Sequence, residues 1–233
     1  MANYGFLFLF SATLTAATTA DTHEVKLSIS TNTFSDYILK HGIVAHDEPV
    51  VQSSINVSLP HGFYAELWGS SGFNHEKNFG KEVDYTVGWT GKHVKVGVSY
   101  YDLNELFNGS QNNIITPFFD VQWKRRIGEH QTLAPFFHSD YIHVTRDSGS
   151  NSGKYVLAGV RHEWRPTARL TISEKGWLSW NRGPFGHDSG FAGRYEVGLG
   201  VNLNRNTTLF LSFSRYRFRQ AQSRTETRSS SSA

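Results

Sequence analysis

The chain has 233 residues and no cysteine, and it carries 23 Lys and Arg against 20 Asp and Glu, a formal net charge of +3. Its length suits one sizeable domain. The lack of cysteine excludes disulfides, thiolate metal ligands and a cysteine nucleophile. The small net charge, without a basic stripe interleaved with aromatics, does not indicate a nucleic-acid partner. Aromatic residues make up 14% of the chain, and Tyr and Trp favour membrane interfaces.

The N-terminal stretch MANYGFLFLFSATLTAATTA has an apolar centre followed by small residues, and it ends just before Asp21. This is the layout of a secretory signal peptide, although no Lys or Arg precedes the apolar run. The alternative is a buried first strand or helix. We predict a signal peptide at residues 1–20, a barrel at residues 21–218 and a disordered polar tail at residues 219–233.

Alternating apolar and polar residues continue through most of the chain. In residues 81–103, Val83 to Trp89 and then Val94 to Tyr100 place apolar side chains on one side of a predicted hairpin. No segment shows a sustained helical period. The pattern predicts eleven strands, at about 25–39, 50–59, 62–71, 81–90, 93–102, 116–127, 131–144, 154–165, 168–180, 191–203 and 206–218.

The predicted connections alternate in length. Short turns lie at 59–62, 91–92, 128–130, 165–167 and 204–206, and longer polar loops at 40–49, 71–80, 102–113, 145–153 and 181–190. Bacterial outer-membrane barrels have short periplasmic turns and long external loops. The alternation therefore predicts that the apolar strand faces meet lipid.

These patterns favour an all-β fold, an antiparallel up-and-down transmembrane β-barrel of 10–12 strands. Twelve is favoured because bacterial single-chain barrels have even strand numbers, whereas the pattern gives eleven. Most predicted strands reach the 9–11 residues that a tilted membrane-spanning strand needs. The last strand ends in Tyr216-x-Phe218, which resembles the terminal signal read by barrel-assembly machinery.

Residues 35–73 carry a series of short motifs. These are Ser35-Asp36-Tyr37, Gly42-Ile43, Pro49, Gly62-Phe63-Tyr64-Ala65 and Trp68-Gly69-Ser70, followed by an Asp-Tyr strand within 82–91. The series resembles the opening of the TorF family of proteobacterial outer-membrane proteins, which are grouped as porins. The resemblance covers about a third of the chain and implies an outer-membrane barrel. Two features depart from the family: Lys40-His41-Gly42 stands where Arg-Gly is usual, and the chain continues beyond Phe218.

An outward apolar face leaves charged residues of both signs on the inner face. The predicted pore-lining residues are Glu66, Glu82, Asp84, Lys95, Asp120, Lys124, Arg161, Glu163, Arg194 and Glu196. Two arrangements stay open: a salt-bridge network that stabilises the barrel, or charges segregated by sign on opposite walls, which would select polar solutes. Simple alternation places His162 and Glu174 on the lipid side.

The sequence gives little support for a metal-binding or catalytic site. Four histidines fall in long loops beside acidic residues, where imidazole and carboxylate could ligate Zn or Cu, but no HExxH motif is present and solvated loop histidines are the favoured interpretation. We predict no metal or cofactor. In FFHSDY (136–141), His138 and Ser139 are adjacent on a strand and point to opposite faces, which opposes a nucleophile–base pair.

The predicted function is an outer-membrane porin or narrow channel for passive diffusion of small polar solutes, without catalysis. Its expected location is the bacterial outer membrane, and its expected partners are outer-membrane lipid, the assembly machinery and the solutes. The alternatives are a secreted, soluble lipocalin-like barrel with an apolar ligand inside, and an outer-membrane enzyme that modifies lipid.

Overall fold

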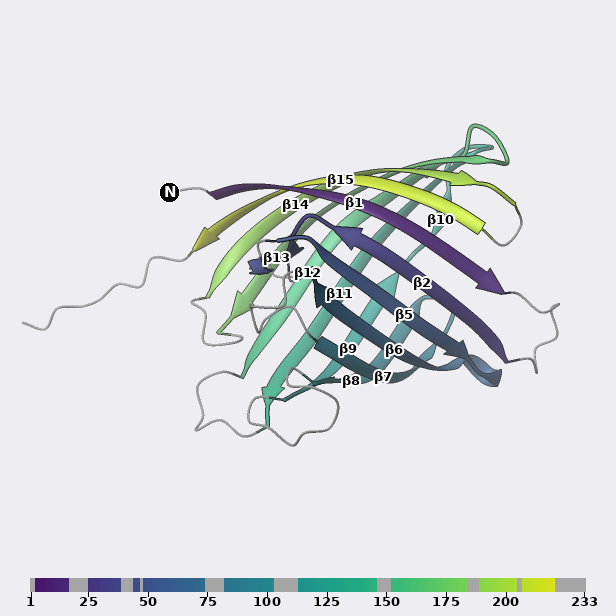
Figure 1. The fold of residues 1–233 in the computed structure, drawn as a ribbon. Coiled ribbons are helices and arrows are strands. Elements are labelled where there is room, and N and C mark those ends of the chain that lie inside the picture. The colour runs from purple at the N-terminus through teal and green to yellow at the C-terminus, as the bar shows by residue number, and fades with distance from the viewer. Residues whose placement is uncertain are drawn as a thin grey trace, which may run out of the picture.

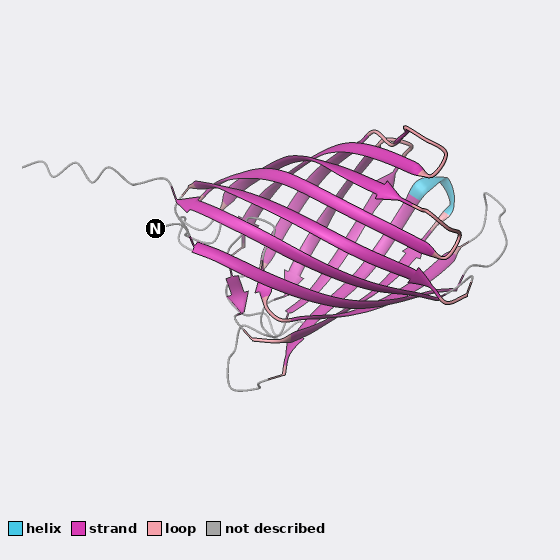
Figure 2. Cartoon of the chain, turned by 90° about the horizontal axis from the view of Figure 1, so that it is seen from above, coloured by secondary structure: helices cyan, strands magenta, loops and turns pink. Residues whose placement is uncertain are grey.

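Long antiparallel strands wind around a common axis in the computed structural model (Figures 1 and 2). The structure describes residues 3–16, 25–38, 44–46, 48–73, 82–102, 113–145, 152–183, 189–204 and 207–220. Its elements are β1 (Asn3–Ala16), β2 (Lys26–Phe34), β3 (Tyr37–Ile38), β4 (Val44–His46), β5 (Val50–Ser58), η1 (Pro60–Gly62), β6 (Phe63–Gly72), β7 (Glu82–Thr90), β8 (Val94–Asp102), β9 (Ile114–Gln122), β10 (Arg125–Arg126), β11 (Gln131–Val144), β12 (Gly153–Trp164), β13 (Leu170–Arg182), β14 (Gly190–Asn202) and β15 (Thr207–Gln220). Within these described ranges, no helix is long and apolar enough to span a membrane.

Twelve long strands follow one another around the sheet. The hydrogen-bonded order is β11-β12-β13-β14-β15-β1-β2-β5-β6-β7-β8-β9, and a further pairing of β9 with β11 joins the two ends of this order. All of these pairings are antiparallel, and each long strand pairs with the next long strand of the chain, while β15 and β1, the last and first strands, also pair. The short β10 extends the ladder beside β11, and β3 and β4 form a separate two-stranded sheet. The predicted all-β, up-and-down, twelve-stranded fold is confirmed.

All eleven strands expected from the alternation are present, and the largest boundary differences, five residues each, are at the ends of β2 and β9. The pattern predicts a strand over 116–127, whereas β9 ends at Gln122. The next residue, Trp123, donates its backbone N–H to the carbonyl of Pro135 on β11. Because proline has no N–H to return, the ladder is interrupted there and resumes only as β10.

The twelfth strand is β1, which lies in the segment predicted to be a signal peptide. Its backbone pairs with β15 from Asn3 to Leu14 and with β2 from Leu9 to Ala16. In the full chain this segment therefore lies between β15 and β2 as a strand of the sheet. Cleavage after Ala20 is untested and stays a prediction. At the other end of the chain, β15 extends to Gln220, two residues beyond the predicted barrel boundary, and the rest of the tail lies outside the described residues.

The two faces of the sheet have opposite chemistry. Large apolar side chains point outward and are exposed, among them Ile29, Ile55, Leu67, Val87, Val96, Val98, Val160, Leu178, Leu199 and Leu211. The inner face carries buried polar groups, among them Gln52, Ser70, Glu82, Ser99, Thr116, His138, Asp140, Ser179, Asn181, Ser212 and Ser214. Among the described residues, thirteen buried side chains are polar or charged and nine are apolar or aromatic, with Ile114, Ile142 and Val144 forming a small cluster. This polar share is high for a soluble protein's core and matches a membrane-spanning barrel with a polar interior.

Exposed aromatic residues gather near both ends of the strands. Phe63, Trp89, Trp123 and Trp164 lie at one end, and Phe73, Tyr141 and Phe191 lie at the other. Phe63 and Phe73 are ten residues apart on the same outward row. At about 3.4 Å per residue and a tilt of about 40°, this separation corresponds to a band of about 26 Å along the barrel axis. The band matches the apolar height of outer-membrane barrels, which is flanked by aromatic girdles.

Most connections sort by length between the two ends of the barrel; the exceptions are 17–25 and 123–130, which are as long as some connections at the other end. At the short-turn end lie 59–62, 91–93, 165–169 and 203–206, together with 17–25 and the β10-containing segment 123–130. At the long-loop end lie 35–49, 73–81, 103–113, 145–152 and 183–189. The alternation predicted from the sequence is therefore present, and residue 3 and residue 220 both lie at the long-loop end (Figure 1).

Candidate functional site: the inner wall of the barrel

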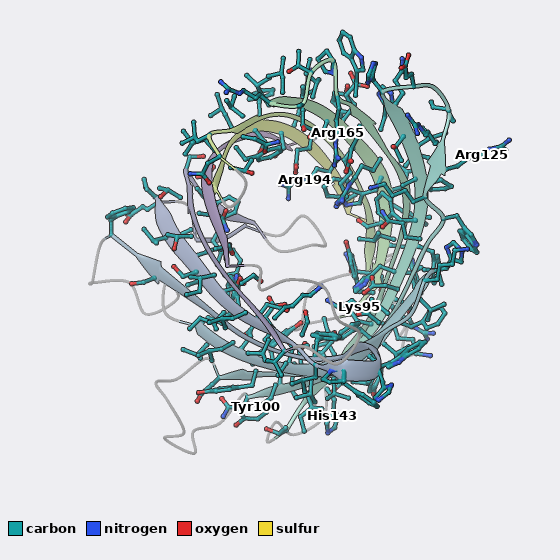
Figure 3. The ribbon with its side chains drawn as sticks, turned by 90° about the vertical axis from the view of Figure 1, so that its right-hand side faces the viewer. Lys95, Tyr100, Arg125, His143, Arg165 and Arg194 are labelled. Carbon is teal, nitrogen blue, oxygen red and sulfur yellow. The ribbon has the colours of Figure 1, made fainter. Side chains whose placement is uncertain are left out.

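Nine of the ten predicted pore-lining residues belong to the inward rows of their strands. They are Glu66 on β6, Glu82 and Asp84 on β7, Lys95 on β8, Asp120 on β9, Arg161 and Glu163 on β12, and Arg194 and Glu196 on β14. The tenth, Lys124, lies just beyond β9, but its amine is 3.8 Å from a carboxylate oxygen of Glu163. Lys95 and Arg194 point into the barrel interior in Figure 3. Their facing follows the prediction, and their role in a pore stays a prediction.

Acidic residues gather on one sector of the inner wall. Glu66, Glu82, Asp84, Asp120 and Asp140 come from β6, β7, β9 and β11, and Lys95 is the cation among them on β8. The amine of Lys95 lies 4.3 Å from the ring centroid of Tyr64 and 5.8 Å from that of Phe118. Phe118 lies flat against the wall because its cross-strand neighbour is Gly97, where a Cβ would come within 2.7 Å of the ring.

A histidine connects two of these acidic residues. The His138 Nδ1 is 2.6 Å from Asp120 Oδ1, and its Nε2 is 3.0 Å from Asp140 Oδ2. Both nitrogens donate to ionised carboxylates only when the imidazole carries two protons, so this geometry fits an imidazolium between two carboxylates. Phe118 stacks on the ring and Tyr155 meets it edge-on. The His138 cluster (His138, Asp120 and Asp140) therefore joins β9 to β11, with His138 and Asp140 buried and Asp120 partly exposed.

Basic residues occupy the opposite sector. Arg161, Lys175 and Arg194 lie on β12, β13 and β14, and β6 lies six strands from β13 in either direction around the ring. The side chain of Trp177 lies between two of them, 4.4 Å from the Lys175 amine and 5.1 Å from the Arg194 guanidinium. Arg194 also pairs with Glu196 at 3.5 Å. Charges on the inner wall are thus segregated by sign, while local ion pairs persist within each sector.

The β3–β4 segment reaches the inner wall at the long-loop end. The Tyr37 hydroxyl donates a 2.7 Å hydrogen bond to Glu82, and its ring lies 5.9 Å from that of Trp68, measured between centroids. Burial, followed by the nearby Glu82 carboxyl, raises the pKa of Tyr37 well above its ordinary value. Tyr37 lies outside the membrane-spanning strands and stays a neutral donor. It holds the β3–β4 segment against β6 and β7.

The two polar residues expected on the lipid side are paired there. His162 Nδ1 is 3.5 Å from Glu174 Oε2, and its Nε2 is 3.2 Å from Gln131 Oε1. Trp164, an exposed aromatic at the short-turn end, follows two residues after His162. The pair therefore lies near the interfacial girdle, where charged residues on the lipid face cost less than at the bilayer midplane.

The described residues of the inner wall give no support to the alternatives of a catalytic site or a metal site. His138 faces inward and uses both ring nitrogens on carboxylates, whereas Ser139 belongs to the outward row. The residues that the structure describes contain no group of three or more His, Asp or Glu side chains that could hold a metal. Three of the loop histidines, His41, His75 and His187, lie outside those residues, and nothing is described of the side chain of the fourth, His46.

The architecture is that of a transmembrane-type β-barrel, with an apolar outside and a charged inside. Residues 16–131, just under half of the chain, match a family described as a bacterial protein of unknown function (Gcw_chp). No curated protein matches the chain. The resemblance to the TorF family is not confirmed by these comparisons and stays a prediction.

Among solved structures, the chain is similar to outer-membrane barrels at low identity. A bacterial polysaccharide outer-membrane secretin shares 11% identity at a TM-score of 0.43, covering 92% of this chain and 98% of its own. The NanC porin shares 8% at 0.40, covering 89% and 98%. A loop-deletion mutant of OmpT, an outer-membrane protein of Vibrio cholerae, shares 8% at 0.38, covering 94% and 99%. At these scores the likeness carries no conclusion about function.

Proposed function

We propose that the protein is a bacterial outer-membrane β-barrel that acts as a narrow channel for passive diffusion of small polar solutes, without catalysis. The observation that carries the proposal is the inverted distribution of side chains, apolar outside and charged inside. The match to a bacterial family supports a bacterial origin. Its partners in this proposal are outer-membrane lipid, the barrel-assembly machinery and the solutes.

Segregation of charge favours a channel over a closed salt-bridge core. The acidic sector runs from β6 to β11 and the basic sector from β12 to β14; the two meet where β11 pairs with β12, and β6 lies opposite β13 across the interior. A field between such sectors acts on polar and dipolar solutes and disfavours apolar ones. The Arg194–Glu196 ion pair lies within the basic sector and is compatible with this field, whereas the Lys124–Glu163 pair links the end of β9 to β12.

The lipocalin-like alternative requires an apolar interior and a hydrophilic exterior. The structure has the opposite distribution, with residues such as Leu178 and Val87 more than 60% exposed on the outside. A soluble protein rarely exposes apolar area on this scale. A lipid-modifying enzyme would need a His, a Ser and an acid on one wall, and His138 and Ser139 lie on opposite faces.

The channel proposal is tested by expressing the full chain in a Gram-negative host and fractionating the cells. We expect the protein in the outer-membrane fraction, a gel-mobility difference between boiled and unboiled samples, and ionic conductance after reconstitution into planar bilayers. A soluble periplasmic protein without the mobility difference would reject the membrane barrel. A heat-modifiable barrel without conductance would reject the channel alone.

Export through residues 1–20 is part of the proposal and is tested by N-terminal sequencing of the purified barrel. The unbroken apolar run from Phe6 to Phe10 departs from the alternation of the other strands, and by register Leu7 and Leu9 lie opposite the inner-face residues Ser214 and Ser212. A signal-peptide core explains this run better than a wall strand does. We expect the mature chain to begin at Asp21, which would remove β1 and leave the eleven long strands predicted from the alternation. An intact N-terminus would instead establish β1 as a permanent twelfth strand.

A further inference from the structure

A small pocket opens on the inner wall near the short-turn end. Its volume is about 40 Å³, and its lining comes from the end of β9, the start of β11 and the end of β12: Gln122, Lys124, Thr132, Ala134, Arg161 and Glu163. A cavity needs about 10–15 Å³ of such volume to hold one water molecule, so the pocket accommodates a small polar group such as a carboxylate rather than a whole solute.

Positive charge exceeds negative charge around this pocket. The Glu163 carboxylate is already engaged by two cations, with Lys124 at 3.8 Å and Arg165 at 3.4 Å. The Arg161 side chain forms no hydrogen bond or ion pair with any residue of the described ranges. A guanidinium on a partly buried inner face, beside a carboxylate that is shared by other cations, is a site for an external anion.

The cross-strand neighbour of Arg161 reinforces this excess. Arg161 lies directly opposite Lys175 on β13, and like charges directly opposite one another on adjacent strands are destabilising. The nearest acid along that row is Glu196, which is opposite Lys175 on its other side and pairs with Arg194. An anion bound at Arg161 would relieve the repulsion between Arg161 and Lys175.

We propose that this pocket binds the carboxylate of a small organic acid as it passes the short-turn end of the channel. The Arg161 guanidinium donates two parallel hydrogen bonds to the carboxylate, and the Gln122 amide and the Thr132 hydroxyl supply further donors within the pocket. The rest of the solute extends into the interior. The inference rests on the proposed channel and adds a solute class to it.

Charges elsewhere on the inner wall differ between the two ends of the barrel. Glu82, Asp84 and Asp140 lie toward the long-loop end of their strands, whereas Arg161 and Lys124 lie toward the short-turn end. A carboxylate is therefore repelled at the long-loop mouth and attracted locally at Arg161, while Glu66, Asp120 and Glu163 also lie toward the short-turn end. The same gradient suits a solute that carries an amine at one end and a carboxylate at the other.

The test uses the full chain, refolded in detergent, and measures succinate binding by calorimetry at low ionic strength. We expect wild-type binding in the millimolar range and roughly tenfold weaker binding for Arg161→Gln, the effect of losing one charge-assisted contact. Arg161→Lys, which keeps the charge but not the two-pronged geometry, should bind with intermediate affinity. The matched control is Arg125→Gln, since Arg125 is at the same end and points away from the barrel (Figure 3); it should change the affinity less than twofold.

Equal weakening by Arg161→Gln and Arg125→Gln would overturn the inference, because only general electrostatic attraction would then remain. Equal binding of succinate and the uncharged succinamide would overturn it as well. Heat-modifiable gel mobility of each variant confirms that it has folded. Bilayer conductance is measured separately, so a channel that conducts but does not bind succinate refutes the site alone, whereas a barrel that does not conduct refutes the proposed function.

Discussion

Replacing His138 with leucine should lower the free energy of unfolding by about 3 kcal/mol, within the range seen when one partner of a buried charge pair is removed. The imidazole holds Asp120 and Asp140 at 2.6 and 3.0 Å, and the Asp140 side chain is only 4% exposed. Without the cation, two carboxylates face each other across β9 and β11, and one of them has no access to bulk water. Urea titration of the refolded barrel, followed by tryptophan fluorescence and gel mobility, measures the change.

Two further variants separate this ionic tie from a general effect of losing a histidine. His143→Leu lies five residues along the same strand on the outward row (Figure 3), and it should change stability by less than about 0.5 kcal/mol. Adding Asp140→Asn to His138→Leu removes the buried charge and should restore part of the loss. A His138→Leu barrel as stable as the wild type would show that the cluster does not bear on stability.

Much of this inner wall could be predicted from the sequence because alternation along a strand fixes its facing. Glu66, Arg161 and Arg194 were assigned inward on that basis, and the structure places them there. The arrangement of their charges required the ring order, because β6 and β13 become opposite walls only when the strands are counted around the barrel. Alternation carries no information on that order.

The His138 cluster shows a second limit of prediction from strand alternation. That His138 and Asp140 share a face follows from their spacing of two residues on one strand. That Asp120 lies opposite His138 depends on the β9–β11 register, which is set where the ladder breaks at Trp123 and Pro135. The sequence pattern continues smoothly to residue 127, so the break and the resulting contact could not be predicted from periodicity.

The contact that Tyr37 makes with the inner wall could not be predicted from the sequence for a different reason. The pattern runs from 25 to 39 as one strand, whereas β2 ends at Phe34 and the chain bends at residues 35 and 36. Ser35 donates a hydrogen bond to the adjacent Asp36 side chain, a local contact that competes with strand continuation. The partner of Tyr37 is Glu82, 45 residues away, and such a long-range contact leaves no mark in local alternation.

Replacing Tyr37 with phenylalanine should release the β3–β4 segment from the inner wall and raise the single-channel conductance. The change removes the hydroxyl that donates to Glu82 and leaves the ring contact with Trp68. Loss of a buried hydrogen bond costs about 1–3 kcal/mol, so the equilibrium between held and released segment should shift by roughly tenfold or more. Bilayer recordings of the two proteins at neutral pH measure the difference.

Matched variants identify the hydrogen bond as the cause. Glu82→Gln keeps an acceptor oxygen for Tyr37, so a change in its conductance reports the lost inner-wall charge and not release of the segment. Tyr141→Phe removes an outward hydroxyl and should leave the conductance unchanged. If Tyr37→Phe conducts no better than Tyr141→Phe, the β3–β4 segment does not restrict the channel.

The dependence on pH follows from the raised pKa of Tyr37, caused by burial first and by Glu82 second. A group whose pKa is raised in the folded state contributes its full stability below its ordinary value, about 10 for tyrosine, and loses it as the pH rises through the raised pKa. The hydrogen bond should therefore hold throughout the neutral and mildly alkaline range. The difference in conductance between the wild type and Tyr37→Phe should stay constant below about pH 10 and narrow above it. A difference that already narrows between about pH 6 and 8, where histidine titrates, would assign control of the segment to an imidazole instead of to Tyr37.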